Sequence, residues 1–225
     1  MLQSHLLDRS ESTYSALSAP DEAMPDASLR DVFLRLGGTI LVERNGEIYA
    51  DGEPAEHVYE VMSGVVRICS YLEDGRRQIC AFHFPGDVFG FELDEVHAFS
   101  AEAVTPCKLA MARKSAFKDA ASREPTLCAA MCRTVATSFA QLQAHVVLLG
   151  HKSAQQRVTA FLKALTRHHA NAGVVELPMS RQDIADHLGL TIETVSRTIT
   201  QLQDLGVISL EGSRKITVRR RQLAA

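Results

Sequence analysis

The chain has 225 residues, of which 46% are hydrophobic and 23% charged, and its formal net charge is −3. This length suits one large domain or two modest ones, and the composition is typical of a globular protein. The sequence has no apolar run of about 18 residues and no signal-peptide pattern at its N-terminus, so we expect a cytoplasmic protein without a membrane partner.

The charge is distributed unevenly along the chain. Residues 180–225 hold seven Lys/Arg against five Asp/Glu, whereas residues 1–179 carry a net charge of −5. A basic C-terminal end on an acidic body favours contact with phosphate at that end only. A solvated tail would have the same composition, so charge alone does not decide between the two.

The first half of the chain predicts an arm followed by a β domain. Residues 1–28 are rich in Ser, Ala, Pro and Asp with little periodicity, and we expect a flexible N-terminal arm. Residues 29–123 contain short alternating segments rich in Val, Ile, Tyr and Phe, separated by glycine turns, which favour an antiparallel β-roll. The turns fall at Asn45-Gly46, Asp51-Gly52, Ser63-Gly64, Asp74-Gly75 and Pro85-Gly86. Asp74-Gly75 gives the clearest hairpin prediction.

From about residue 112 the period becomes helical, and residues 124–150 predict one long helix that starts near Pro125. Residues that recur every three or four positions form a stripe along this helix. A stripe that continues over so many turns usually packs against a partner helix, so we predict a homodimer seam. A helix packed only on its own roll remains the alternative. The predicted interface residues are Leu127, Met131, Thr134, Ser138, Leu142, His145 and Leu149.

Residues 151–225 predict a winged helix-turn-helix, which makes the whole chain an α+β protein. Ser180 is a plausible N-cap, Gly189 supplies the turn, and Thr191 caps the following helix. "VISLEG" and "RKITVRR" then form a small hairpin, the wing. The expected core stripe of the second helix is Ile192, Val195, Ile199, Leu202 and Leu205.

The opposite face of this second helix carries Glu193, Ser196 and Arg197, which we predict to read DNA bases. Arg197 can donate two hydrogen bonds to guanine, Glu193 can accept one from cytosine, and Ser196 is small enough to lie against a thymine methyl. An ordinary intrahelical Glu–Arg pair is the alternative. The predicted contacts to the DNA backbone are Ser180, Arg181, Gln182, Thr191, Thr194, Thr200, Arg214 and Lys215.

From about residue 30 onward the chain resembles the superfamily of the cyclic-AMP receptor protein and the fumarate-and-nitrate-reduction regulator. The resemblance rests on the roll glycines, on "FPGDVFG" at residues 84–90, on the long helix and on "MSRQDIADHLGLTIETVSRTITQLQDLGVI". It implies a homodimeric transcription factor that contacts RNA polymerase. "E-T-V-S-R" resembles the fumarate-and-nitrate-reduction branch, which implies half-sites like TTGA in a palindrome TTGA-N6-TCAA.

No cofactor is expected. The family's cyclic-nucleotide binders hold the phosphate with an Arg, but no Arg or Lys lies between Arg77 and Lys108. The arm contains no Cys for an iron–sulfur cluster, and Cys128 and Cys132, four apart, do not complete one, so buried structural thiols are the better interpretation. None of the nine His stands out as a haem or metal ligand.

Without an effector site, the chain most resembles the FixK-like branch. This resemblance implies an activator that binds DNA without a small-molecule effector and controls microoxic, nitrogen-fixation or denitrification genes. The alternative is a haem- or ligand-dependent sensor of nitric oxide or redox state with the same fold. We expect no enzyme, because the sequence shows no nucleophile–base set, P-loop or metal-ligand cluster.

Overall fold

The computed structural model describes residues 27–92, 94–167, 174–212 and 215–218. The elements in chain order are α2 (Ala27–Leu36), β1 (Gly37–Val42), β2 (Glu47–Tyr49), β3 (His57–Ser63), β4 (Val66–Tyr71), β5 (Arg77–His83), β6 (Val88–Phe89), β7 (Ser100–Ala103), β8 (Cys107–Arg113), α3 (Lys114–Arg123), α4 (Pro125–His151), α5 (Ala154–Arg167), β9 (Val174–Glu176), α6 (Arg181–Leu188), α7 (Ile192–Asp204), β10 (Ile208–Glu211) and β11 (Lys215–Val218). The predicted arm, residues 1–28, lies outside the described residues except for its last two, which start α2.

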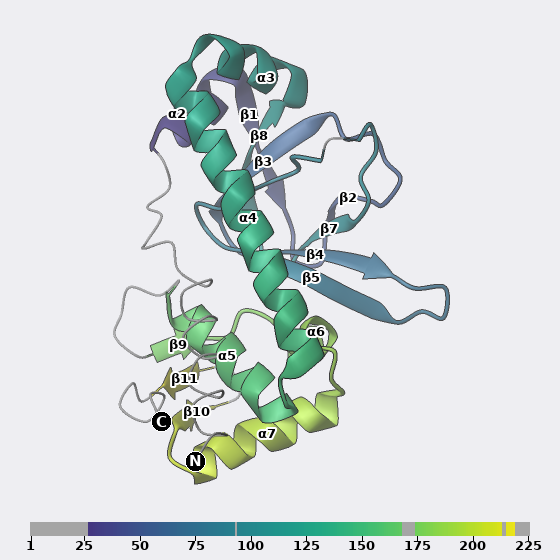
Figure 1. Cartoon of the computed structure of the whole chain (residues 1–225), viewed down its shortest axis with the longest axis vertical. Helices are drawn as coiled ribbons and strands as arrows, with labels where there is room; N and C mark the ends of the chain where they lie inside the picture. Colours follow the sequence, from purple (N-terminus) through teal and green to yellow (C-terminus); the bar gives the residue numbers. More distant parts are fainter. Residues whose placement is uncertain (1–26, 93, 168–173, 213–214, 219–225) are drawn as a thin grey trace, which may run out of the picture.

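The N-terminal half is a β-roll of two four-stranded sheets, with strand orders β1-β8-β3-β6 and β2-β7-β4-β5, in which every described strand pair is antiparallel. The roll encloses a core that includes Tyr59, Val61, Phe89 and Leu109. The predicted Asp74-Gly75 hairpin joins β4 to β5, with Gly75 at a φ of +80°. The hairpin projects from the body of the roll (Figure 1).

Three helices cover one end of the roll. Phe33 of α2 and Phe117 of α3 pack ring against ring, with centroids 4.9 Å apart, in a cluster that also holds Leu127 of α4. Helix α2 was not predicted, because residues 29–36 were assigned to the roll. Its apolar residues Leu29, Val32 and Phe33 nevertheless follow helical spacing and are all buried.

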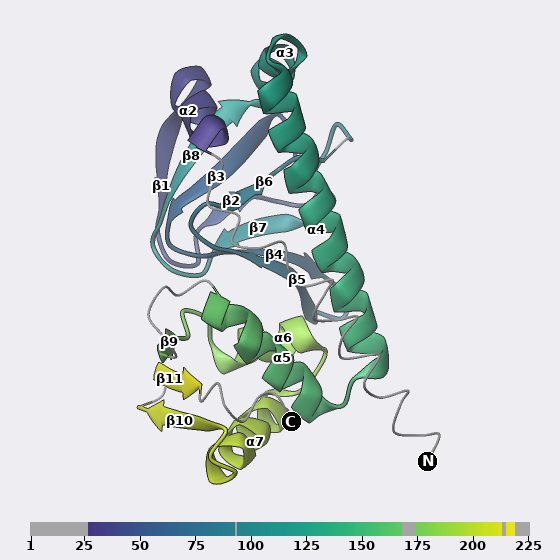
Figure 2. The same ribbon diagram turned by 60° about the vertical axis from the view of Figure 1, so that its left-hand side comes forward.

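Helix α4 connects the two halves of the molecule. It starts at Pro125, ends one residue past Gly150, and runs beside the roll to the C-terminal module (Figure 2). Both halves lie on the same side of α4 in this view, so its other side faces outward. No helix among the described residues is long and apolar enough to cross a membrane.

The C-terminal module contains α5, α6, α7 and a small sheet of order β10-β11-β9. The predicted wing is the β10–β11 hairpin, and the predicted strand before the motif is β9. Val158 of α5, Ile184 of α6 and Val195 of α7 are buried in one cluster, which also includes Val65 and Val104 of the roll. The predicted α+β class, with a roll, a long helix and a winged helix-turn-helix, is confirmed.

Candidate DNA interface

Helix α6 begins with reciprocal caps. The Ser180 hydroxyl accepts a hydrogen bond from the Asp183 main-chain N–H at 3.0 Å, and the Asp183 carboxylate accepts one from the Ser180 N–H at 2.9 Å. Two N–H groups at the helix start are satisfied in this way. The helix ends at Gly189, whose φ of +61° falls in the left-handed region that glycine tolerates.

Helix α7 starts at Ile192, three residues after Gly189, and has its own cap. The Thr191 hydroxyl accepts from the Thr194 N–H at 3.2 Å, as the sequence predicted. The predicted core stripe is right in its middle and wrong at its ends, because Ile192 is 38% and Leu205 62% exposed. Thr198, which the sequence left out of the core, is buried instead.

The three predicted base-reading residues lie together on the exposed side of α7. Glu193, Ser196 and Arg197 are all exposed, and the Arg197 Nε donates to the main-chain carbonyl of Glu193 at 3.4 Å. Hydrogen bonds from its own backbone N–H and from the Thr191 hydroxyl hold the pKa of Glu193 below its ordinary value. The face therefore offers a charged acceptor and a charged donor, the pair needed for cytosine and guanine edges.

The predicted backbone-contact residues come from the start of α6, from α7 and its cap, and from the wing. Arg214 lies outside the described residues. Gln182, Thr191, Thr200 and Lys215 are exposed, whereas Ser180, Arg181 and Thr194 are half-buried. The structure thus brings the starts of α6 and α7 and the wing strand β11 into one module (Figure 1).

The sequence did not reveal the attachment of α6 to the roll. Arg67 of β4 donates to Glu102 at 2.8 Å and to Asp183 at 3.1 Å, and Arg77 of β5 donates to Asp186 at 2.7 and 2.9 Å. Arg77 also pairs with Asp183. These five side chains are mostly buried, and we call them the docking network. They join the β4–β5 hairpin to the first helix of the motif.

The network favours the charged form of two of its carboxylates, Asp183 and Glu102. Burial opposes ionisation of Asp183, but hydrogen bonds from Ser180 and the charges of Arg67 and Arg77 outweigh it, so the pKa of Asp183 is lowered. Burial also opposes ionisation of Glu102, but bonds from Tyr71 and Arg67 lower its pKa. Removing one partner from a buried ion pair of this kind strongly destabilises the folded protein, because the other charge is left buried without a partner.

A second contact beside the network involves His187 of α6. Its Nδ1 donates to the Ile79 carbonyl at 3.0 Å, and its ring stacks on His145 of α4 with centroids 4.2 Å apart. Burial and the neighbouring His145 lower the pKa of His187 to about 3. The junction of α4, β5 and α6 therefore holds a neutral imidazole at ordinary pH.

The predicted dimer seam requires a correction, because several of its residues face their own chain. Leu127 is 1% exposed in the α2–α3 cluster, Met131 packs against that cluster, and His145 is stacked on His187. Thr134 and Leu149 are half-buried and Ser138 is exposed, which leaves Leu142 as the one large exposed hydrophobic residue of the seven.

Most of the exposed apolar residues of α4 lie on the face next to the predicted seam, and we call this face the α4 stripe. The predicted set has the right period but starts on the wrong residue, so most of its members lie to one side of this stripe. The stripe consists of Cys128, Cys132, Val135, Phe139, Leu142 and Val146.

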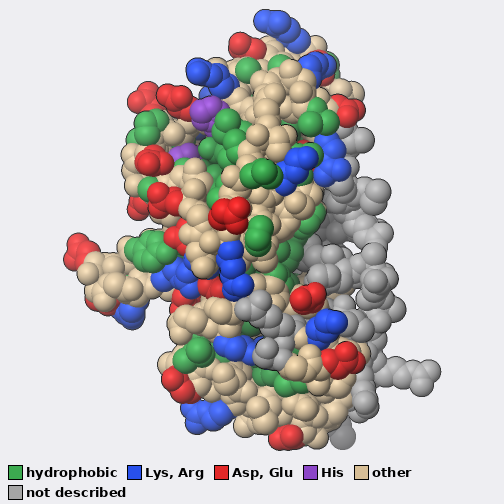
Figure 3. Space-filling model, turned by 180° about the vertical axis from the view of Figure 1, so that it is seen from behind, with side chains coloured by type: hydrophobic (Ala, Val, Ile, Leu, Met, Phe, Trp, Pro, Cys, Tyr) green, Lys and Arg blue, Asp and Glu red, His purple; other side chains and the backbone are tan. Residues whose placement is uncertain are grey.

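The roll interior is filled with aromatic side chains. Tyr49 stacks on His97 with ring centroids 3.5 Å apart, Tyr59 stacks on Phe89, and the Glu92 carboxylate lies 3.2 Å from the Nδ1 of His97. Among the residues that the structure describes, no group of three His, Cys, Asp or Glu could hold a metal ion. Acidic side chains gather over the roll when the molecule is seen from behind (Figure 3).

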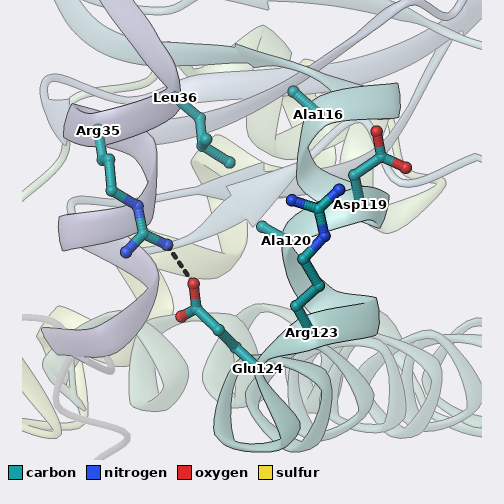
Figure 4. A pocket seen from close by; sticks show the side chains of 7 residues that line it. All are labelled: Arg35, Leu36, Ala116, Asp119, Ala120, Arg123 and Glu124. Atoms are coloured by element: carbon teal, nitrogen blue, oxygen red, sulfur yellow. Dashed lines mark hydrogen bonds and ion pairs between the residues drawn. The ribbon is translucent and has the colours of Figure 1, made fainter.

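A hollow of about 330 Å³ lies between α2 and the α3–α4 junction (Figure 4). Arg35 and Glu124 line it and form an ion pair at 2.6 Å, with Arg123 and Asp119 on the other wall. Both ion-pair partners are well exposed, so their contribution to stability is small. The hollow lies at the end of the molecule opposite α7, away from the DNA interface (Figure 1).

Each half of the chain matches a known protein family. Residues 156–223 match the family described as Crp-like helix-turn-helix domain, and residues 40–124 match the cyclic nucleotide-binding domain. The nitrogen fixation regulation protein FixK of Azorhizobium caulinodans is 48% identical over 211 residues, covering 90% of this chain and 83% of that protein. FixK of Rhizobium meliloti is 42% identical over 172 residues, 76% of this chain and 78% of that protein.

A solved structure agrees with these relatives. The structure of FixK2 from Bradyrhizobium japonicum superposes with a TM-score of 0.81 at 41% identity, covering 84% of this chain and 96% of that one. The roll, the long helix and the winged motif with its exposed Glu193 and Arg197 define a helix-turn-helix transcription regulator. The chain belongs to the CRP/FNR family, in its FixK branch.

Proposed function

We propose that this regulator binds a palindrome of the type TTGA-N6-TCAA as a homodimer and reads each half-site with Glu193, Ser196 and Arg197. The observation that carries the proposal is the exposed face of α7, where a carboxylate and a guanidinium lie one helical turn apart. That spacing lets both side chains reach base edges in the major groove together. The capped starts of α6 and α7, with Lys215 on the wing, contact phosphates on either side.

The proposed dimer forms through the α4 stripe. Val135, Phe139, Leu142 and Val146 are each at least half exposed and follow spacings of four, three and four. This is the pattern of a two-stranded coiled coil, in which such residues interlock between parallel helices. A two-fold axis along α4 would place the two α7 helices at the same end of the dimer, as a palindrome requires.

We propose that binding needs no small-molecule effector. Two observations support this: aromatic rings occupy the roll interior, and the roll is already joined to α6 by the docking network. Arg67, a cation in the roll that could otherwise meet a phosphate, is committed to Glu102 and Asp183. The roll therefore serves here as a rigid support for the DNA-binding module.

The proposed role is activation through contact with RNA polymerase, at genes for microoxic growth, nitrogen fixation or denitrification. The names of the relatives support this, since FixK proteins are described as nitrogen fixation regulators and AadR of Rhodopseudomonas palustris, 36% identical, as a transcriptional activatory protein.

The test uses the full chain purified without added ligand. We expect it to shift a TTGA-N6-TCAA duplex and to leave a scrambled duplex of equal length unbound at the same salt concentration. An absorption spectrum of the same sample checks for a chromophore. Equal binding of both duplexes would refute the proposed reading, whereas a Soret band or a requirement for an added effector would favour a ligand-dependent sensor.

A further inference from the structure

The α4 stripe contains two thiols as well as its apolar side chains. Cys128 precedes Cys132 by four residues, and Cys132 precedes Val135 by three. The alternating spacing of four and three that marks the rest of the stripe therefore continues through both cysteines. Both cysteines are exposed, like the apolar residues that follow them. The sequence interpretation of these two as buried structural thiols is therefore wrong.

The other three cysteines differ in their surroundings. Cys69 and Cys107 are buried, and Cys80 is half-buried in β5. Burial raises the pKa of all three thiols, that of Cys69 to about 11. Because the thiolate is the reactive form, these three are poor partners for oxidation. The two exposed thiols both lie on the face that carries the proposed dimer.

A parallel two-fold dimer brings like residues together. Each stripe residue of one copy then faces the same residue of the other copy across the axis. Packed helices lie about 8–10 Å apart and their Cα atoms sit about 2.3 Å from each axis, so the closest Cα atoms of facing seam residues approach to roughly 3.5–5.5 Å. Disulfides span Cα separations of about 4.4–6.8 Å, so a small Cys at such a position is within bonding range of its counterpart.

We infer that Cys128 and Cys132 form an interchain thiol site, in which each cysteine can be joined by a disulfide to the same cysteine of a second copy of this chain. The inference rests on the proposed homodimer. It assigns a modification site to the start of α4, one and two turns before the apolar ladder that begins at Val135. A disulfide there would hold the two copies together when dilution would otherwise separate them.

The chemistry requires a two-electron oxidant, and hydrogen peroxide serves. The thiolate of one copy attacks the peroxide, breaks its O–O bond and becomes a sulfenic acid, with hydroxide released. The thiol of the second copy then attacks the sulfenic sulfur, forms the S–S bond and displaces water. One peroxide is reduced to two waters for each pair of thiols oxidised, and a thiol reductant reverses the bond.

The test compares the full chain with C128S, C132S, the double variant C128S/C132S and the matched control C80S. Each protein is first sized by light scattering in reducing buffer, then treated with hydrogen peroxide and analysed by non-reducing gel and peptide mass mapping. We expect native protein and C80S to give a covalent dimer that reductant dissolves, each single variant to give less, and the double variant to give none. The mapped bonds join like cysteines.

The outcomes separate this inference from the dimer on which it rests. A monomer in reducing buffer would overturn the proposed dimer and the thiol site together. A reduced dimer that fails to cross-link, or a covalent dimer that persists in C128S/C132S, would overturn the thiol site alone. The double variant should still dimerise when reduced, because Phe139, Leu142 and Val146 remain.

Discussion

The two helices of the DNA-binding motif have opposite surroundings. Helix α6 places Asp183, Asp186 and His187 against the β4–β5 hairpin, where the two carboxylates form ion pairs and the imidazole donates to Ile79. Helix α7, which begins four residues after the end of α6, leaves Glu193 and Arg197 exposed. Charge in the motif therefore has two uses: on α6 it attaches the module to the roll, and on α7 it remains available to a ligand.

This difference predicts that changes in α6 alter stability and changes in α7 alter DNA binding. The buried core shared by both helices joins them into one unit, so α6 also sets where α7 is held. Substitutions in each helix, measured for both unfolding and DNA binding, show whether the two effects are separable.

Asp183→Ala should have the largest effect. It removes the carboxylate that caps α6 and leaves Arg67 and Arg77 short of a buried partner. Losing one member of a buried ion pair costs about 3–5 kcal/mol of the free energy of unfolding. Urea unfolding followed by circular dichroism measures it.

Asp74→Ala is the matched control, because Asp74 pairs with Arg76 on the same hairpin but in full solvent. We expect its unfolding midpoint to equal that of the native chain. Equal midpoints for Asp183→Ala and Asp74→Ala would show that the docking network does not stabilise the protein.

Arg197→Ala should leave the unfolding midpoint unchanged and weaken operator binding by about 1–3 kcal/mol, because it removes a donor pair for guanine. Discrimination at that guanine should relax, which binding to operators with single base changes would reveal. Lys215→Ala is the comparison variant: as a phosphate contact it should weaken all duplexes alike and reduce the salt dependence. If Arg197→Ala lost affinity equally on every duplex, Arg197 would be a backbone contact.

The parts of the motif that the sequence predicted correctly depend on residues close together in the chain. Ser180 with Asp183, Gly189, and Thr191 with Thr194 act within one helical turn, so their spacing is visible in the sequence. The docking network joins Arg67 to Asp183, 116 residues away, and nothing local marks either residue as a partner. Such contacts arise only from the tertiary fold.

The sequence predicted the extent of the long helix α4 but not which of its faces is exposed. Its length and its period of three and four were predictable, and α4 is confirmed as one helix. The face that turns outward was not predictable, because Leu127 and Leu142 are equally apolar and differ in that α2 and α3 cover only Leu127. Helix α2 was predictable in principle, since Leu29, Val32 and Phe33 already follow helical spacing.

The attachment of α6 should weaken in mild acid. His187 is neutral in the folded chain, with a pKa of about 3, while in the unfolded chain it takes up a proton near its ordinary value. Its contribution is fully present above about pH 6.5 and is lost as pH falls toward 3, by roughly 1–2 kcal/mol at pH 5. Unfolding curves between pH 7 and pH 5 measure the slope.

The variant His187→Gln should flatten that slope, because its amide can still donate to the Ile79 carbonyl but does not titrate. His151, in the exposed last turn of α4, provides the control variant His151→Gln, which should keep the native slope. A native slope in His187→Gln would assign the pH dependence to His145 or to His83, whose pKa values burial also lowers.

Thr191→Ala should have the smallest effect, because it removes only the cap of α7. Its hydroxyl caps α7 with one main-chain bond to Thr194, whereas Ser180 and Asp183 cap α6 reciprocally and share the docking network. Losing an N-cap costs about 1 kcal/mol, so the free energy of unfolding should fall by that amount, which is well below the effect of Asp183→Ala. Thr191→Ser keeps the hydroxyl and should restore native stability. If the alanine variant lost operator affinity under conditions in which it is fully folded, while the serine variant kept it, Thr191 would contact phosphate in addition to capping α7.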